Sequence, residues 1–193
     1  MPRGRFALAL GVLCWSSILA AQTKAPAPSA SSLRGIASLS VGRGLRFNNP
    51  FRLQRPLGES AESVSLSATY LDLGAALLVS ENGFRQGVLV SGSVALQGIG
   101  QFVLTPSYMA QVDLQPTFGL RGRLGVPVVV APDATLGLEA AVGPSFSVAY
   151  GLGVTAELVG SIFFGAATEE NNVTTVPMLS LAFGMFFDHE VDL

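Results

Sequence analysis

Hydrophobic and polar residues alternate one by one along most of the chain after residue 35. In the first such stretch, Ala37, Leu39 and Val41 share one face, and Ser38 and Ser40 share the other. A period of two is typical of β-strands that have one apolar face. Clusters of Gly, Pro, Asn and Asp separate eight segments of this kind, at residues 36–48, 62–73, 86–97, 106–114, 117–126, 134–144, 147–165 and 175–188. No run of 18 apolar residues follows residue 35, so the pattern predicts no transmembrane helix there.

The connections between these segments alternate in length. Tight turns are predicted around Gln115-Pro116 and Pro144-Ser145, and an intermediate one around Glu81-Asn82-Gly83. Longer connections are predicted at residues 49–61, 98–105, 127–133 and 166–174. An even number of strands with short turns at one end and long loops at the other is the plan of outer-membrane barrels. The pattern therefore predicts an all-β fold, an eight-stranded antiparallel up-and-down transmembrane β-barrel.

The polar faces of the segments indicate which side is inside. They consist mostly of Ser, Gly and Thr with isolated charges, which suits a narrow lumen better than a water-exposed sheet rich in Lys and Glu. Buried charges need partners, so we expect Arg121 or Arg123 to pair with Glu139 on the next strand; the alternative is solvated charges on a soluble sheet. The predicted lumen charge network comprises Arg46, Arg121, Arg123, Asp113, Glu139 and Glu157.

Two charged residues break the pattern. Arg43 and Asp72 both fall on the apolar faces of their segments. Either residue could lie at a membrane boundary, or a bulge near a glycine could reset the register of its strand.

The N-terminal residues predict export from the cytoplasm. A basic start with Arg3 and Arg5, an apolar stretch from Phe6 to Ala20 and small residues at its end are typical of a secretory signal. We expect a signal peptide at 1–21, an Ala/Pro/Ser-rich linker at 22–34 and a β-barrel domain at 35–193. Removal of the signal would take away Cys14, the single cysteine, and would leave 9 of the 11 basic residues against 13 acidic ones.

The charge composition limits the kinds of binding partner that the sequence predicts. Only 12% of the residues are charged, against about 25% in a typical globular domain. No basic run occurs, which argues against nucleic acid as a partner. No lysine follows Lys24; lysines keep exposed sheet edges of soluble proteins apart, so their lack suits a closed barrel in lipid.

Candidate chemistry is sparse. His189 is the single histidine, in an acidic C-terminal stretch that we expect to be solvated. With one histidine, and with no cysteine after the predicted signal peptide, the sequence predicts no catalytic, metal or cofactor site and therefore no enzyme. A membrane-embedded hydrolase or acyltransferase is the least favoured alternative. The segment around Arg52 and Arg55 is basic, and we expect it on the outer side, either contacting lipopolysaccharide phosphates or folding over the barrel mouth.

From about residue 36 to 188 the chain resembles the small eight-stranded outer-membrane barrels. The last segment reads LSLAFGMFF, and Phe186-Phe187 is similar to the aromatic ending of that family, although six residues follow it here. The resemblance implies an integral bacterial outer-membrane protein with a structural, adhesive or envelope-interaction role. The alternative is a soluble secreted or periplasmic barrel that binds an apolar small molecule; it would need residues such as Leu138, Leu152 and Leu181 inside.

Overall fold

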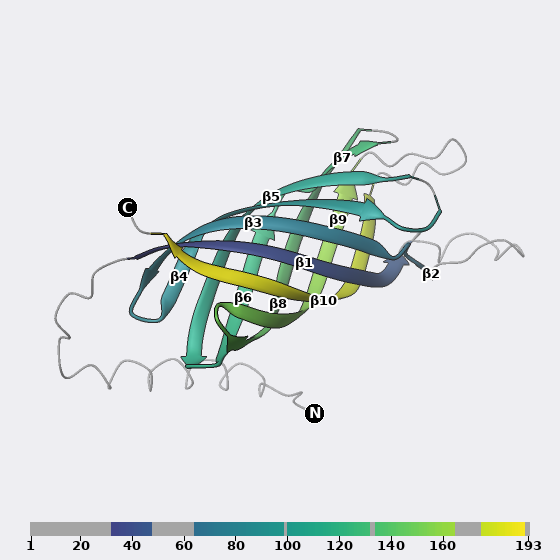
Figure 1. Ribbon diagram of the computed structural model, residues 1–193. Helices are drawn as coiled ribbons and strands as arrows, with labels where there is room; N and C mark the ends of the chain where they lie inside the picture. Colours follow the sequence, from purple (N-terminus) through teal and green to yellow (C-terminus); the bar gives the residue numbers. More distant parts are fainter. Residues whose placement is uncertain (1–31, 48–63, 99, 132–133, 165–174, 192–193) are drawn as a thin grey trace, which may run out of the picture. The chain divides into compact units, whose positions relative to one another are not determined.

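The computed structural model describes residues 32–47, 64–98, 100–131, 134–164 and 175–191, all of them in one compact unit. The described elements are ten antiparallel strands (Figure 1). Their bounds are β1 Ser32–Phe47, β2 Val64–Leu66, β3 Tyr70–Glu81, β4 Phe84–Ala95, β5 Phe102–Gln115, β6 Phe118–Gly125, β7 Val128–Ala131, β8 Thr135–Ala149, β9 Leu152–Phe164 and β10 Thr175–Val191. No helix among these residues is long and apolar enough to cross a membrane.

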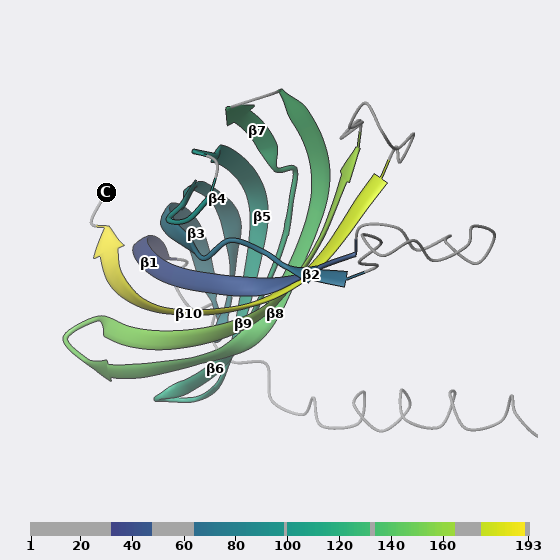
Figure 2. The same ribbon diagram turned by 90° about the vertical axis from the view of Figure 1, so that its right-hand side faces the viewer.

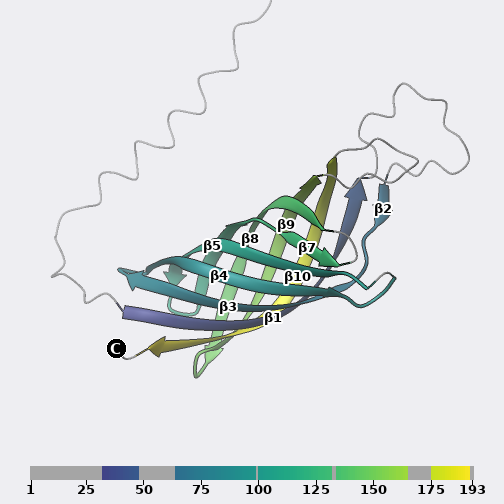
Figure 3. The ribbon, with the colours of Figure 1, turned by 90° about the horizontal axis from the view of Figure 1, so that it is seen from above.

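The ten strands occupy eight strand positions around the barrel, and we call each position a wall. β2 and β3 make one wall, broken at residues 67–69, and β6 and β7 make another, broken at Val126-Pro127. Each wall pairs with the next in chain order, and β10 pairs with β1 from Leu33 to Arg46. Figure 2 shows these strands curving round a common interior, and Figure 3 shows β2 beside the end of β1. The predicted eight-stranded, closed, up-and-down antiparallel barrel is therefore confirmed.

The register sets the shape of the barrel. A path of paired residues that starts at Arg34 on β1 and visits each wall returns to β1 at Gly44, ten residues further along. A stagger of this size with eight strands corresponds to a tilt of about 40° from the barrel axis. Eight tilted strands leave an interior that side chains fill.

Three short turns meet at the end of the barrel where β1 begins and β10 ends. Asn82-Gly83 joins β3 to β4, Pro116-Thr117 joins β5 to β6, and Tyr150-Gly151 joins β8 to β9. Backbone carbonyls of these turns accept hydrogen bonds from the neighbouring hairpins, for example Gly83 O from Asp113 N at 2.8 Å. We call the opposite end, where β1 ends and β10 begins, the long-loop end.

Apolar side chains face outward. Leu138, Leu152 and Leu181 are 55%, 52% and 54% exposed, while polar residues such as Ser145 and Gln111 are buried in the interior. This arrangement is the reverse of the one that a lipocalin-like soluble barrel requires, so the second interpretation of the sequence is wrong on this point. Outward aromatic rings occur near both ends, with Phe84, Phe118, Phe146 and Phe187 toward the turns and Phe102 and Phe164 toward the long loops.

Several predicted boundaries were wrong. The turn expected at Pro144-Ser145 is absent, because β8 continues to Ala149 and the chain reverses at Tyr150-Gly151, both with positive φ. The second segment extends to Glu81 instead of ending at residue 73. β1 begins at Ser32, three residues before the expected domain start, and the supposed C-terminal tail is part of β10 up to Val191.

Candidate functional site

The first group of interior charges lies on three consecutive walls. We call Arg121 and Arg123 on β6, Glu139 on β8 and Glu157 on β9 the central ion cluster. Arg123 bridges both carboxylates, with Nη1 at 2.5 Å from Glu139 Oε1 and Nε at 3.2 Å from Glu157 Oε2. Arg121 Nη1 lies 3.7 Å from Glu157 Oε1. All four side chains are at least 86% buried, so these ion pairs are largely removed from water.

Strand register explains why these side chains meet. Arg121 and Arg123 are two residues apart, so both point inward from the same strand. Glu139 is the register partner of Gly125, which follows Arg123 by two residues on β6 and lies on the same inward face. Ser161 on β9 is the register partner of Glu139. Ser161 Oγ donates a hydrogen bond to Glu139 Oε2 at 3.0 Å. The carboxylate of Glu139 is thus held between a guanidinium and a hydroxyl.

Arg121 has a second kind of contact. Its guanidinium carbon lies 4.6 Å above the centroid of the Phe186 ring on β10. A cation over an aromatic face is stabilised by the ring quadrupole, more so when water is excluded. Arg121 therefore connects the central ion cluster to the apolar part of the lumen.

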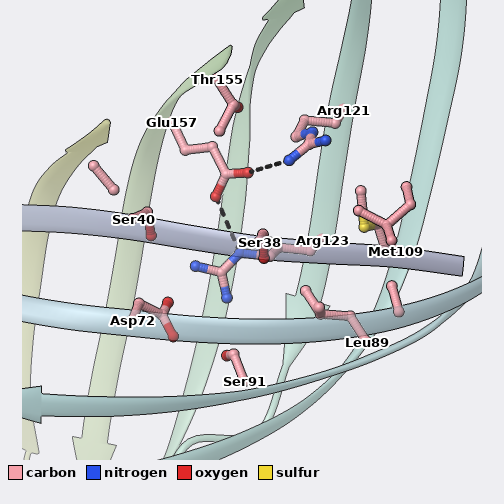
Figure 4. Close-up of a pocket in the computed structure, with 13 residues that line it drawn as sticks. Ser38, Ser40, Asp72, Leu89, Ser91, Met109, Arg121, Arg123, Thr155 and Glu157 are labelled. Carbon is pink, nitrogen blue, oxygen red and sulfur yellow. Dashed lines mark hydrogen bonds and ion pairs between the residues drawn. The ribbon is translucent and has the colours of Figure 1, made fainter. Parts of the chain in front are cut away.

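A small cavity adjoins the central ion cluster (Figure 4). Its volume is about 30 Å³, and polar residues including Ser38, Ser40, Asp72, Ser91 and Arg121 line it. Asp72 Oδ1, Ser91 Oγ and two nitrogens of Arg121 are buried without a protein hydrogen-bond partner. The lining also includes apolar side chains such as Leu89 and Met109, and a cavity of this volume has room for about two water molecules. We therefore interpret it as a hydration site that satisfies the charges of the lumen.

A second group of charges lies near the turn end. We call Arg34 on β1, Arg85 on β4, Asp113 on β5 and Asp188 on β10 the terminal ion cluster. Arg34 Nε lies 2.8 Å from Asp188 Oδ1, and Arg85 Nη2 lies 2.6 Å from Asp113 Oδ2. Arg85 also forms an ion pair with Asp188. Asp188 thus links the last strand to the first strand and to β4 across the lumen.

An apolar layer separates the two ion clusters. Ile36, Leu78, Leu89, Met109 and Phe186 form a buried group in which Leu78 is fully buried. The sequence predicted a lumen lined mostly by Ser, Gly and Thr, so this layer of inward apolar residues was not expected. The layer and the two ion clusters lie in the part of the lumen that the structure describes, and the small cavity of Figure 4 lies among them.

In both ion clusters, arginines neutralise the charges of aspartates and glutamates. Neither ion cluster contains a histidine or cysteine, and no group of three potential metal ligands occurs among the described residues. His189 is exposed on β10, and its ring stacks with Phe187 at 6.1 Å between centroids. Buried ion pairs of this kind hold strands in one register, because breaking one leaves an uncompensated charge in the interior.

The predicted lumen residues are divided by the structure. Arg121, Arg123, Glu139 and Glu157 lie together, whereas Asp113 belongs to the terminal ion cluster. Arg46 is exposed near the end of β1 and takes part in no ion pair among the described residues, so its assignment to the network is corrected. Arg52 and Arg55 lie outside the described residues.

Five lumen residues were missed, four of them charged. Tyr70 and Asp72 point inward because the break at residues 67–69 shifts the side-chain alternation of β3. For Asp72, a shift of this kind was one of the two explanations that the sequence left open. Arg34 had been assigned to the linker and Asp188 to the tail, although both continue the alternation of their strands. Arg85 precedes the segment predicted at 86–97 by one residue, so its inward position was a signal that could have been used.

Comparisons with known proteins found similar structures but no similar sequence. No family model matches the sequence, and no curated protein matches it. Among solved structures, Neisserial surface protein A is 14% identical over 82% of this chain and 99% of its own, with a TM-score of 0.49. Ail, the attachment invasion locus protein of Yersinia pestis, is 12% identical with the same coverage and TM-score. A de novo designed transmembrane β-barrel is 10% identical over 80% and 95% of the two chains, with a TM-score of 0.46.

Proposed function

We propose that this protein is an integral bacterial outer-membrane β-barrel with a structural, adhesive or envelope-interaction role. One observation carries the proposal: large apolar side chains are exposed on the outer side of every wall, as Leu39, Leu73, Val90, Leu104 and Leu124 illustrate. A water-soluble protein rarely exposes continuous apolar surface beyond a few hundred Å². A closed barrel leaves no unpaired edge, which is the condition for a sheet to lie in hydrocarbon.

The aromatic residues support the same location. Outward phenylalanines lie near both ends of the strands, as in the aromatic girdles that flank the apolar band of membrane barrels. The Phe118 and Phe146 rings are in contact near the turn end, with centroids 4.9 Å apart. In this orientation the turns lie on the periplasmic side and the long-loop end faces outward, after export directed by the predicted signal peptide.

The filled lumen argues for a role in contact and support. An eight-stranded barrel with two ion clusters and an apolar layer inside offers no path for solutes. A catalytic role has no support in the two ion clusters, because their charges are paired with one another. The long-loop end is then the surface that meets other molecules, and we include lipopolysaccharide phosphates near Arg52 and Arg55 as contacts of that surface.

Cell fractionation tests this proposal. We expect the full chain, expressed in a Gram-negative host, in the outer-membrane fraction, with faster migration of the unheated sample in detergent gels because the closed barrel resists unfolding. In planar bilayers the purified protein is expected to show no stable conductance. Recovery in the soluble periplasmic fraction would contradict the location, and a steady conductance would contradict the filled lumen.

A further inference from the structure

Asp72 adds a carboxylate to the lumen that neither ion cluster balances. Its Oδ1 atom is buried and has no hydrogen-bond partner, and the carboxylate forms no ion pair among the described residues. Arg121 and Arg123 already pair with Glu139 and Glu157. Together with Asp72, the central ion cluster therefore contains three carboxylates and two guanidinium groups, which leaves one negative charge in excess. A buried charge of this kind is costly unless a partner balances it.

Strand register places serine hydroxyls around Asp72. Its register partner on β1 is Ser40. The next inward position of β3 is Gly74, whose register partners are Ser38 on β1 and Ser91 on β4. Since inward and outward side chains alternate on each strand, these serines point into the lumen on the two sides of β3.

Gly74 leaves open the space that these hydroxyls face. A Cβ at this position would lie 2.5 Å from Ser38 Oγ and 3.7 Å from Ser91 Cβ. The small cavity beside the central ion cluster lies here, with Asp72, Ser38, Ser40 and Ser91 in its lining (Figure 4). Ser91 is only 4% exposed, and its Oγ is buried without a hydrogen-bond partner, as Asp72 Oδ1 is. The cavity thus offers one carboxylate oxygen and one hydroxyl oxygen that are both unpartnered, with two further serines beside them.

We propose that this cavity binds one sodium ion through Asp72 Oδ1, Ser91 Oγ and the hydroxyls of Ser38 and Ser40. Hard cations take oxygen ligands, and a single positive charge balances the one carboxylate in excess. A divalent ion would leave an excess of positive charge instead, and no group of three His, Cys, Asp or Glu residues that could hold one occurs in the part of the chain that the structure describes. The sodium site depends on the closed lumen alone, so it would be present whether or not the barrel lies in a membrane.

A water molecule beside the sodium ion accounts for Arg121. Its Nε and Nη2 atoms are buried without a partner, and the residue lines the same cavity. The cavity volume of about 30 Å³ has room for about two water-sized molecules, so one position remains next to the ion. A water molecule there can accept a hydrogen bond from Arg121 with one lone pair and coordinate the sodium ion with the other. This arrangement separates the two positive charges.

The test is urea unfolding of the full chain, refolded in a zwitterionic detergent, while sodium chloride replaces choline chloride at constant ionic strength. Choline is too large for the cavity, and constant ionic strength keeps the screening of surface charges unchanged. A ligand that binds only the folded protein shifts the folding equilibrium by mass action. Above the dissociation constant, each tenfold rise in sodium concentration should therefore raise the folding equilibrium constant of the wild-type protein about tenfold.

Asp72→Asn removes the charge and keeps the size of the side chain. We expect it to abolish the dependence on sodium. In choline chloride it should unfold at a higher urea concentration than the wild-type protein, because the unbalanced charge is gone. A variant that only damaged the fold would unfold at a lower urea concentration in both salts.

The serines provide a matched pair of variants. Ser91→Ala should weaken the affinity for sodium severalfold, because it removes one ligand. Ser107→Ala is the control, since Ser107 is also buried with an unpartnered hydroxyl but is not part of the cavity lining. It should keep the sodium dependence of the wild-type protein.

Three results would overturn the sodium site. The first is equal stability of the wild-type protein in sodium and choline chloride. The second is a sodium dependence that persists in Asp72→Asn, which would assign the effect to another part of the chain. The third is a wild-type stability that does not respond to sodium and rises on acidification, which would show that a proton balances Asp72. Cell fractionation decides the proposed function independently of all three.

Discussion

Replacing Arg123 by methionine is expected to lower the free energy of unfolding by about 3–5 kcal/mol, the usual cost of breaking a buried ion pair by removing one partner. Among the residues that the structure describes, Arg123 alone contacts both Glu139 and Glu157, and Asp72 lines the adjoining cavity. Without it, Arg121 would be left to balance three carboxylates from its position 3.7 Å from Glu157. The loss can be measured by urea unfolding of the protein refolded in detergent or liposomes, followed by heat-modifiable migration.

The carboxylate partners provide the control. Glu139→Gln keeps the Ser161 contact and the side-chain volume, so we expect a smaller loss, of about 1–3 kcal/mol. The combined variant Arg123→Met, Glu139→Gln should recover part of the stability that Arg123→Met loses, because it removes the uncompensated charge at Glu139 while Glu157 keeps its ion pair with Arg121. If Arg123→Met unfolds at the wild-type urea concentration, the central ion cluster does not stabilise the barrel.

Leu73→Arg is expected to destabilise the barrel in a bilayer by about 2–4 kcal/mol, the cost of an arginine near the midplane on the lipid side of a membrane barrel. Leu73 is 61% exposed and points outward about midway along the wall formed by β2 and β3. The expected decrease would be measured by reversible folding into liposomes of fixed lipid composition.

A substitution outside the apolar band separates the effect of lipid from that of exposure. Tyr150 is 97% exposed in the turn between β8 and β9, so Tyr150→Arg should change the stability by less than about 0.5 kcal/mol. A soluble barrel predicts the same small change at Leu73, where arginine would simply face water. Equal, small effects at both positions would therefore count against a lipid-facing wall.

Much of the fold could be predicted because strand alternation is a local property. Once Leu39, Leu138 and Leu181 had been placed on apolar faces with Ser and Gly opposite them, the direction of the lumen followed. Errors arose where the local rule was interrupted. The break at residues 67–69 turned Tyr70 inward. No residue in this stretch is of a type that predicts an irregularity in a strand. The turn at Tyr150-Gly151 was missed because tyrosine is an uncommon residue at positive φ, 53° here.

The interior could be predicted only in part. The pairing of Arg123 with Glu139 was expected from opposite charges on adjacent strands. The terminal ion cluster joins Arg85 on β4 to Asp188 on β10, and that contact crosses the lumen. It depends on the stagger of the closed barrel, which alternation within single strands does not determine. The apolar layer around Leu78 was missed because a run such as Ala76-Leu77-Leu78-Val79 has no polar residue to reveal its inward face.

Fluorescence quenching by lipids brominated along the acyl chain tests the outward apolar face most directly. Trp15, the single tryptophan, lies in the predicted signal peptide, so a tryptophan placed at Leu73 would report alone in the processed protein. We predict strong quenching of Leu73→Trp by brominated lipid and little quenching of Tyr150→Trp, which iodide in the buffer should quench instead. If iodide quenches the tryptophan at position 73 and brominated lipid leaves its emission unchanged, then the exposed leucines face water and the barrel does not lie in a membrane.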